Sequence, residues 1–222
     1  NAWLGAADTV LDSLGKLAYR SGDMHCAHDV WVLVHAHRSR ALGESHPNQQ
    51  AVRINLATCK MLLGRLHEAL SLQEQAVAIL ARTSPAGHPE LLGARNNLAI
   101  TKFKLGDLSG ALAIQKEVLE IMSRTLPDDD PGLLRSRQNV ALTLYAAGDI
   151  AGALLMQESI LETQSKTLPH DHPALQSTRT NLASTKLAAG DLAAAYDLQA
   201  VVLRVRSRTM HDDHPDLQTA RN

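Results

Sequence analysis

The sequence is poor in aromatic residues and in net charge, and each shortage argues against a class of partner. Only 3% of the 222 residues are aromatic, which argues against binding single-stranded nucleic acid by base stacking. The formal net charge of −1 provides no basic excess for a nucleic acid or an anionic membrane surface. We therefore expect no nucleic-acid partner and no membrane partner.

Long apolar runs and cysteines are also scarce. No uninterrupted apolar run approaches the ~20 residues that cross a membrane. The two cysteines, Cys26 and Cys59, are too few for a disulfide framework, although a single bridge between them stays possible. We predict two reduced, buried thiols and a cytoplasmic location. The chain begins at Asn1 without Met, so a removed leader stays an open alternative.

Motifs that carry chemistry are missing as well. The sequence has no Gly-rich phosphate loop, no Gly-x-Ser-x-Gly and no His-Glu-x-x-His. A cluster in the first repeat, His25, Cys26, His28, His35 and His37, raises a metal hypothesis, but a zinc site needs four ligands or three plus water. We predict no catalytic residue, no bound metal and no cofactor, and hence no enzyme.

What the sequence does have is a period of 42 residues. A fixed period of this size predicts a solenoid, in which each repeat packs only on its neighbours. The residues that recur at this step are Pro47, Pro89, Pro131, Pro173 and Pro215; Gly22, Gly64, Gly106, Gly148 and Gly190; and Asn55, Asn97, Asn139 and Asn181.

The period divides the chain into repeats within one predicted domain, residues 1–222. Residues 1–45 form a degenerate first repeat, and residues 214–222 begin a further, truncated repeat. Because the pattern stops in mid-helix, we expect the chain to belong to a longer array. The four full repeats are 46–87, 88–129, 130–171 and 172–213.

Each repeat is predicted to hold two antiparallel helices, which we name helix A and helix B. His46, His88, Asp130 and His172 each precede a proline, so a polar cap and a pre-set first helical residue begin helix A. The recurring glycine ends helix A, and an Asp after it starts helix B. In the first repeat we expect helices over about 6–19 and up to about residue 40.

The residues Asn96-Asn97-Leu98-Ala99, Gly106 and Ala111, with the Leu-Pro-x-Asp-His-Pro linker at 168–173, resemble tetratricopeptide repeats. They are most similar to the 42-residue repeats of kinesin light chains and of arrays attached to NB-ARC-type signalling ATPases. The resemblance covers about residues 6–222 and implies an all-α fold, a right-handed superhelical α-solenoid of antiparallel helix pairs. Two rows depart from the common pattern: glutamine replaces an aromatic residue at 73, 115, 157 and 199, and lysine replaces tyrosine at 60, 102 and 186.

In this family helix A lines a concave groove in which partners bind, so the resemblance implies a peptide-binding groove here. The asparagine row can anchor an extended peptide backbone, because an amide both donates and accepts; alternatively, each Asn bonds a neighbouring helix. An apolar row beside it supplies pockets or simply packs between helices. The candidate groove residues are the asparagine row Asn55, Asn97, Asn139 and Asn181; the apolar row Met61, Phe103, Tyr145 and Leu187; and Asn96, Lys104, Arg135 and Gln138.

An arginine row lies two residues before the asparagine row and therefore points another way around helix A. We expect it to be structural, with the glutamine row and nearby glutamates of helix B as possible acceptors. An acidic partner is the functional alternative. The row consists of Arg53, Arg95, Arg137, Arg179 and Arg221.

Three functional hypotheses follow. The first is a non-catalytic scaffold that binds a peptide or a folded partner domain in the concave groove. The second is a sensor or regulatory segment of a larger signalling ATPase or protease, packed on a catalytic domain of the same polypeptide. The third is end-to-end self-association through the apolar ends of the repeat array.

Overall fold

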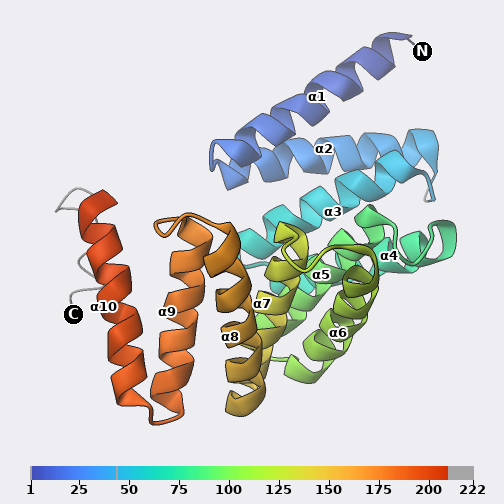
Figure 1. The fold of residues 1–222 in the computed structure, drawn as a ribbon. Coiled ribbons are helices and arrows are strands. Elements are labelled where there is room, and N and C mark those ends of the chain that lie inside the picture. The colour runs from blue at the N-terminus through green and yellow to red at the C-terminus, as the bar shows by residue number, and fades with distance from the viewer. Residues whose placement is uncertain (1, 44, 210–222) are drawn as a thin grey trace. The chain divides into compact units, whose positions relative to one another are not determined.

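A computed structural model describes residues 2–43 and 45–209, and all regular secondary structure in these ranges is α-helical (Figure 1). The chain divides into two compact units between Ile114 and Gln115, within one helix. The described helices are α1 (Ala2–Arg20), α2 (Met24–Leu42), α3 (Pro47–Leu62), α4 (Leu66–Thr83), α5 (Pro89–Lys104), α6 (Leu108–Thr125), α7 (Pro131–Ala146), α8 (Ile150–Thr167), α9 (Pro173–Ala188) and α10 (Leu192–Thr209).

The helix A starts predicted from the prolines are confirmed in all four full repeats. His46 Nδ1 accepts a hydrogen bond from the Asn48 N–H at 3.1 Å. Asp130 Oδ1 likewise accepts hydrogen bonds from the Gly132 and Leu133 N–H groups, at shorter distances of 2.8 and 2.9 Å. Because His and Asp both offer an acceptor at this position, the residue type varies while the helix start stays fixed. In the first repeat α1 starts at Ala2, earlier than expected.

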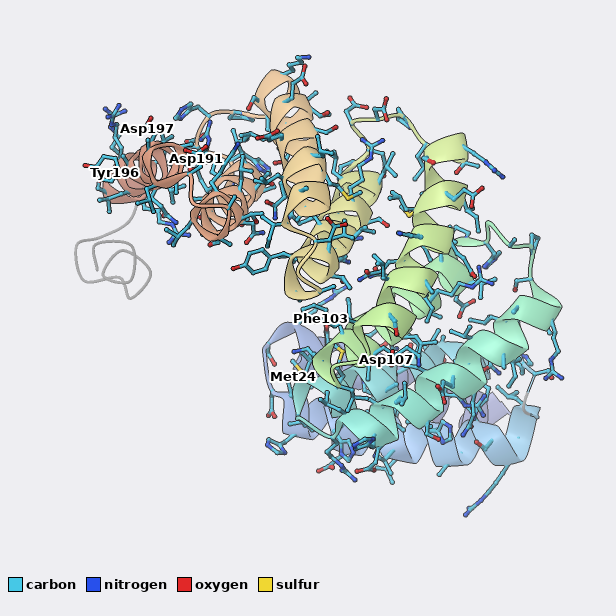
Figure 2. The ribbon with its side chains drawn as sticks, turned by 90° about the horizontal axis from the view of Figure 1, so that it is seen from below. Met24, Phe103, Asp107, Asp191, Tyr196 and Asp197 are labelled. Atoms are coloured by element: carbon cyan, nitrogen blue, oxygen red, sulfur yellow. The ribbon has the colours of Figure 1, made fainter. Side chains whose placement is uncertain are left out.

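The predicted turn between helices A and B is also confirmed. Gly106 has φ +84°, a left-handed conformation that strains residues with a side chain. The Gly106 and Asp107 N–H groups donate to the Phe103 and Lys102 carbonyls at 3.0 and 2.9 Å, which closes the end of α5. Asp107 Oδ1 then accepts from the Gly110 N–H at 2.9 Å and starts α6. Figure 2 marks Asp107 at this turn.

In the first unit, the core lies between successive helices and is built from small and large residues in alternation. Ala27 of α2 is fully buried, and Trp31 packs beside it against α3. Gly15 of α1 lets α1 and α2 approach closely, because a Cβ there would lie 2.8 Å from the Trp31 ring. One alanine of helix B recurs at the 42-residue step and is buried each time: Ala27, Ala69, Ala111, Ala153 and Ala195.

The second unit repeats this arrangement with aliphatic residues. Ile160 of α8 and Leu133 of α7 are fully buried, and Leu175 of α9 is only 1% exposed. Helix α8 packs against both α7 and α9, so helix B is sandwiched between two A helices. On α10, Tyr196 and Asp197 point outward from the helix (Figure 2).

The two thiols differ from each other. Cys59 is buried and free, as predicted, and desolvation raises its thiol pKa to about 11. Cys26 is also free but exposed, so the prediction of a buried thiol was wrong there. It lies on the outer side of α2, two residues after the helix start, where no neighbouring helix packs within the described residues. No described helix is both long and apolar enough to cross a membrane.

Candidate functional site

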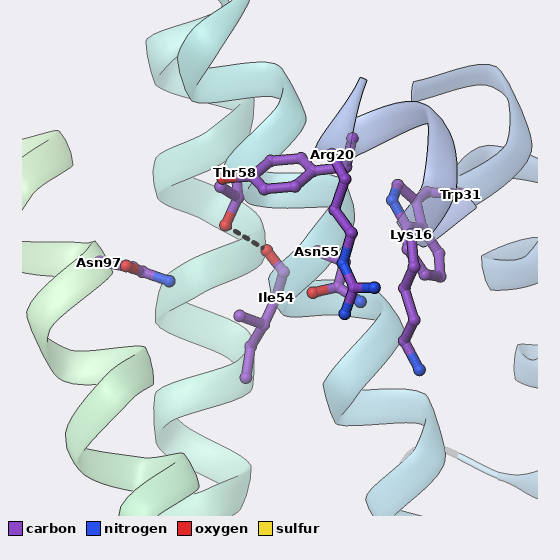
Figure 3. A pocket seen from close by; sticks show the side chains of 8 residues that line it. Lys16, Arg20, Trp31, Ile54, Asn55, Thr58 and Asn97 are labelled. Carbon is purple, nitrogen blue, oxygen red and sulfur yellow. Dashed lines mark hydrogen bonds between the residues drawn. The ribbon is translucent and has the colours of Figure 1, made fainter. Parts of the chain in front are cut away.

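The first unit contains a pocket of about 320 Å³ on the A helices (Figure 3). It spans three consecutive repeats, because α1, α3 and α5 all contribute side chains and α2 adds one. The lining residues are Lys16, Tyr19, Arg20, Trp31, Ile54, Asn55, Thr58 and Asn97. Two members of the predicted asparagine row therefore face one pocket.

The two asparagines are half-buried and available for a ligand. Neither the Asn55 nor the Asn97 side-chain amide makes a hydrogen bond within the described part of the chain, and Figure 3 shows Asn97 pointing from α5 toward α3. Thr58 differs, because its hydroxyl donates to the Ile54 carbonyl of its own helix at 2.8 Å. Each amide can thus pair with a peptide backbone, because it offers both a donor and an acceptor.

Among the pocket residues that the sequence analysis missed are all three that come from α1: Lys16, Tyr19 and Arg20. Subtracting 42 from the apolar-row position Met61 gives Tyr19, so the repeat period could have placed them. The signal was obscured because Ser13 stands at the asparagine position of the first repeat. Lys16 and Arg20 lie one helical turn apart and give the pocket two cations that the predicted groove lacked.

The positive charge of this pocket is only partly offset. Lys16 Nζ lies 2.6 Å from Asp12 Oδ2, but Asp12 is shared with Arg38, whose Nη2 lies 3.5 Å from the other oxygen. Arg20 makes no ion pair among the described residues and is exposed. In Figure 3 the Lys16 and Arg20 side chains extend in the same direction. The pocket therefore suits a ligand group with negative charge.

The second unit contains a separate pocket of about 420 Å³ between α7 and α9, closed by the end of α8. Two of the predicted groove residues, Arg135 and Gln138, line this pocket. Gln164 of α8 is buried, and its Oε1 has no hydrogen-bond partner in the described structure. The Gln138 amide oxygen and nitrogen are likewise buried without a partner. Leu134, Leu168 and Pro131 add apolar surface.

The other predicted groove residues line neither pocket. In the apolar row, Met61 is buried, Phe103 is half-buried, and Tyr145 and Leu187 are exposed. Lys104 is exposed at the end of α5. The remaining three asparagines are also half-buried: Asn96, Asn139 and Asn181. Of these, Asn96 and Asn139 already interact within the protein.

The arginine row is engaged inside the protein wherever its contacts are seen. Arg53 is buried and its Nη1 donates to Gln50 Oε1 at 2.9 Å. Arg179 is buried and donates to the His170 carbonyl at 3.2 Å, while Arg137 pairs with Asp128 at 2.5 Å. Arg221 lies outside the described residues.

For two members of the arginine row, Arg137 and Arg179, the structure shows partners other than the helix B acceptors that we suggested. Arg137 and Arg179 bond the loop that precedes their own helix A, because their side chains reach back toward the helix start. Three members of the glutamine row, Gln73, Gln115 and Gln157, are buried in the core. The Gln73 and Gln157 amides have no hydrogen-bond partner in the described structure.

The lysine row ties helix A to helix B. Lys60 pairs with Glu68 at 2.7 Å and Lys102 with Asp107 at 2.9 Å. Arg65 also donates hydrogen bonds to the Glu68 carboxylate. These bonds, and next the bond from Lys60, lower the pKa of the Glu68 carboxyl to about 2. Lys186 pairs with Glu158 at 2.6 Å, which raises the lysine pKa. These lysines replace the family's tyrosine by a charge-assisted contact.

The histidine cluster forms no metal centre in the described residues, where no group of three or more His, Cys, Asp or Glu side chains converges. His28 Nδ1 lies 3.0 Å from Asp29 and its Nε2 lies 3.1 Å from Arg65 Nη1. These contacts involve both ring nitrogens of His28, one of the five residues of the cluster.

Comparison with known proteins gives consistent matches. Two family models described as tetratricopeptide repeat match the chain, one over residues 90–166 and the other over 51–90 and 175–216. A protein of Podosopora anserina, named as a kinesin light chain with nearly identical TPR-like repeats, is 29% identical, with a TM-score of 0.80. The match covers 91% of this chain and 97% of that one.

Two further solved structures share the fold at low identity. BtubC (BKLC) from P. vanneervenii is 22% identical, with a TM-score of 0.77 over 95% of this chain and 85% of its own. RapI in its apo form is 12% identical, also with a TM-score of 0.77, over 91% of this chain and 71% of its own. No curated protein sequence matches the chain.

Proposed function

Since this chain belongs to the tetratricopeptide repeat family, with repeats of the kinesin-light-chain-like type, we propose that it is a non-catalytic scaffold for protein interactions. In finer detail, we propose that the helix A surface of each unit holds an extended segment of a partner protein. The first unit carries the better-defined site, and the pocket around Asn55 and Asn97 is the observation that supports it.

The first-unit pocket combines two kinds of recognition. The unpaired Asn55 and Asn97 amides, one repeat apart, can each donate to a peptide carbonyl and accept from a peptide N–H. Lys16 and Arg20 lie at one side and attract a carboxylate, while Tyr19 offers an aromatic surface. We therefore propose an extended peptide that carries an acidic side chain as the ligand of this unit.

The second-unit pocket suits a different part of a ligand. Its apolar walls, including Leu134 and Leu168, accept an aliphatic or aromatic side chain. Arg135 at the pocket can meet a carboxylate or a carbonyl.

The test starts from a displayed library of random, unstructured peptides, selected on the intact chain. The best enriched peptide is then labelled and titrated against the protein and against an Asn55→Ala, Asn97→Ala double variant. Each net hydrogen bond contributes about 0.5–1.5 kcal/mol, so losing two should weaken binding by about 5- to 150-fold. Raising the salt concentration should also weaken binding, because exposed charges are screened.

A matched control is Gln75→Ala, which removes an exposed amide from α4, outside the pocket. It should leave the affinity unchanged. If the double variant folds normally and binds the selected peptide as tightly as the unchanged protein, the proposed groove is wrong. The alternative role, a regulatory segment packed on a catalytic domain of the same polypeptide, stays a prediction.

A further inference from the structure

The second-unit pocket contains buried amide groups that nothing in the described structure satisfies. Gln164 of α8 is only 6% exposed, and its Oε1 has no hydrogen-bond partner there. The Oε1 and Nε2 atoms of Gln138 on α7 are buried without a partner as well. Both residues line the pocket of about 420 Å³ among α7, α8 and α9, which pack against one another (Figure 1). Because a buried amide without partners costs free energy, these two require an explanation.

The 42-residue period shows that the same two positions are apolar in the first unit. Two periods, or 84 residues, before Gln164 stands Leu80, which is 2% exposed. Two periods before Gln138 stands Ile54, which packs against the core cluster that contains Leu80. An aliphatic contact in one unit thus corresponds to two unsatisfied amides in the other. Packing alone favours the aliphatic pair, so the amides indicate that this pocket binds a polar group.

The unsatisfied atoms define the polar group that complements them. They comprise two acceptors, Gln138 Oε1 and Gln164 Oε1, and one donor group, Gln138 Nε2. A primary amide matches this set, because its NH2 group donates two hydrogen bonds and its oxygen accepts. The terminal torsion of a glutamine side chain is soft, so both pocket amides can turn toward a ligand at little cost.

The rest of the pocket favours an uncharged side chain with an aliphatic stem. Arg135 and Asp129 add one charge of each sign to the lining, so the pocket does not select a carboxylate by net charge. Leu134 and Leu168 supply apolar surface for methylene groups. Of the two side chains that end in a primary amide, glutamine has the longer stem and therefore reaches deeper from an extended backbone.

We propose that the second-unit pocket binds a glutamine side chain of the extended partner segment, an inference that rests on the proposed function. The ligand amide pairs with the Gln138 and Gln164 amides, while its methylene stem lies against the apolar wall of the pocket. The first unit offers no such pairing at the equivalent positions, because Ile54 and Leu80 have no polar side-chain atoms.

The test uses N-acetyl-L-glutamine methylamide as the probe, titrated into the intact, isotope-labelled chain and followed by nuclear magnetic resonance. The side-chain NH2 signals of Gln138 and Gln164 are assigned from their loss in Gln138→Ile and Gln164→Leu. We expect saturable shifts of both signals. The corresponding methionine derivative is similar in length but lacks the amide, so it should bind at least about fivefold more weakly. The double variant should lose this preference.

The two substitutions introduce the residues found two periods earlier, so the variants should fold, which circular dichroism melts verify. The matched control is Gln75→Leu, which removes an exposed amide from α4 and should leave the preference unchanged.

The proposal is overturned if the probe shifts neither signal, if the methionine derivative binds equally, or if the glutamate derivative binds more tightly. It is also overturned if the double variant keeps the preference. The first-unit peptide titration separates the two proposals. If peptide binding depends on Asn55 and Asn97 while the glutamine probe fails, the proposed function stands and only the glutamine site is wrong.

Discussion

Gly15 of α1 is predicted to be required by the Trp31 ring rather than by the backbone. The site lies within a helix, where alanine is normally more stable than glycine by about 0.8–1.0 kcal/mol. At Gly15, however, a methyl group would stand 2.8 Å from Trp31 Cε2 and 2.9 Å from Cζ2. Trp31 is buried in a core cluster and cannot move away freely.

The magnitude follows from comparison with a second glycine in the same unit. Gly93 of α5 is also helical, but a Cβ there meets no atom within 4 Å. Gly93→Ala should therefore stabilise the protein by about 1 kcal/mol, which is the difference in helix propensity between alanine and glycine. Gly15→Ala gains the same term and loses about 1–3 kcal/mol to overpacking. The two variants should differ in free energy of unfolding by about 1–3 kcal/mol, with Gly15→Ala the less stable.

Urea denaturation followed by circular dichroism measures both variants against the unchanged chain. The comparison is internal, because both substitutions add one methyl group to a helix of the first unit. Equal midpoint shifts for the two variants would refute the reasoning, since the Trp31 contact would then carry no cost. A change in the slope of either transition would indicate separate unfolding of repeats, and hydrogen exchange at α1 would then replace the global measurement.

Three further predictions concern stability and thiol chemistry. Gly106→Ala should destabilise the protein by about 1–2 kcal/mol in the same urea assay, because the residue has φ +84°. Hydrogen bonds from Arg65 and then Lys60 lower the pKa of Glu68 from 4.5 to about 2. The Glu68 carboxylate therefore stabilises the folded protein above pH 4.5, and this stabilisation is lost as the pH falls toward 2. In the Glu68→Gln variant, the free energy of unfolding should fall less steeply over that pH range. A thiol reagent should modify Cys26 in the folded protein and reach the buried Cys59 only in urea, so that equal native reaction rates would contradict the structure.

Much of the fold could be predicted because its determinants are local and repeated. Pro89 with His88 begins a helix through a cap that needs only neighbouring residues, and Gly106 ends it through one left-handed residue. The placement of Asn55 and Asn97 at one pocket follows from the same period. Such features depend on sequence spacing alone, so one repeat predicts the next.

Features that depend on non-repeating neighbours could not be predicted. Arg137 pairs with Asp128 and Arg179 with the His170 carbonyl, and these loop residues differ between repeats. Cys26 is exposed because its side of α2 receives no helix in the described structure, although the residue type favours burial. The first-unit cations were missed for a related reason, since the pattern breaks at Ser13 and conceals the register of Lys16.

The polar contacts between successive helices have a consequence for folding order. Leu56, Leu98 and Leu182 are interchangeable as packing surfaces, so aliphatic contacts alone allow a helix to join the wrong neighbour during folding. Arg38 of α2 donates to the Asn48 carbonyl at the start of α3 at 3.1 Å, which gives this pair of helices a specific polar contact. Lys186 of α9 pairs with Glu158 of α8 at 2.6 Å and provides such a contact for that pair of helices. Mispaired helices would leave such groups buried without partners, and that penalty selects the correct sequence of neighbours.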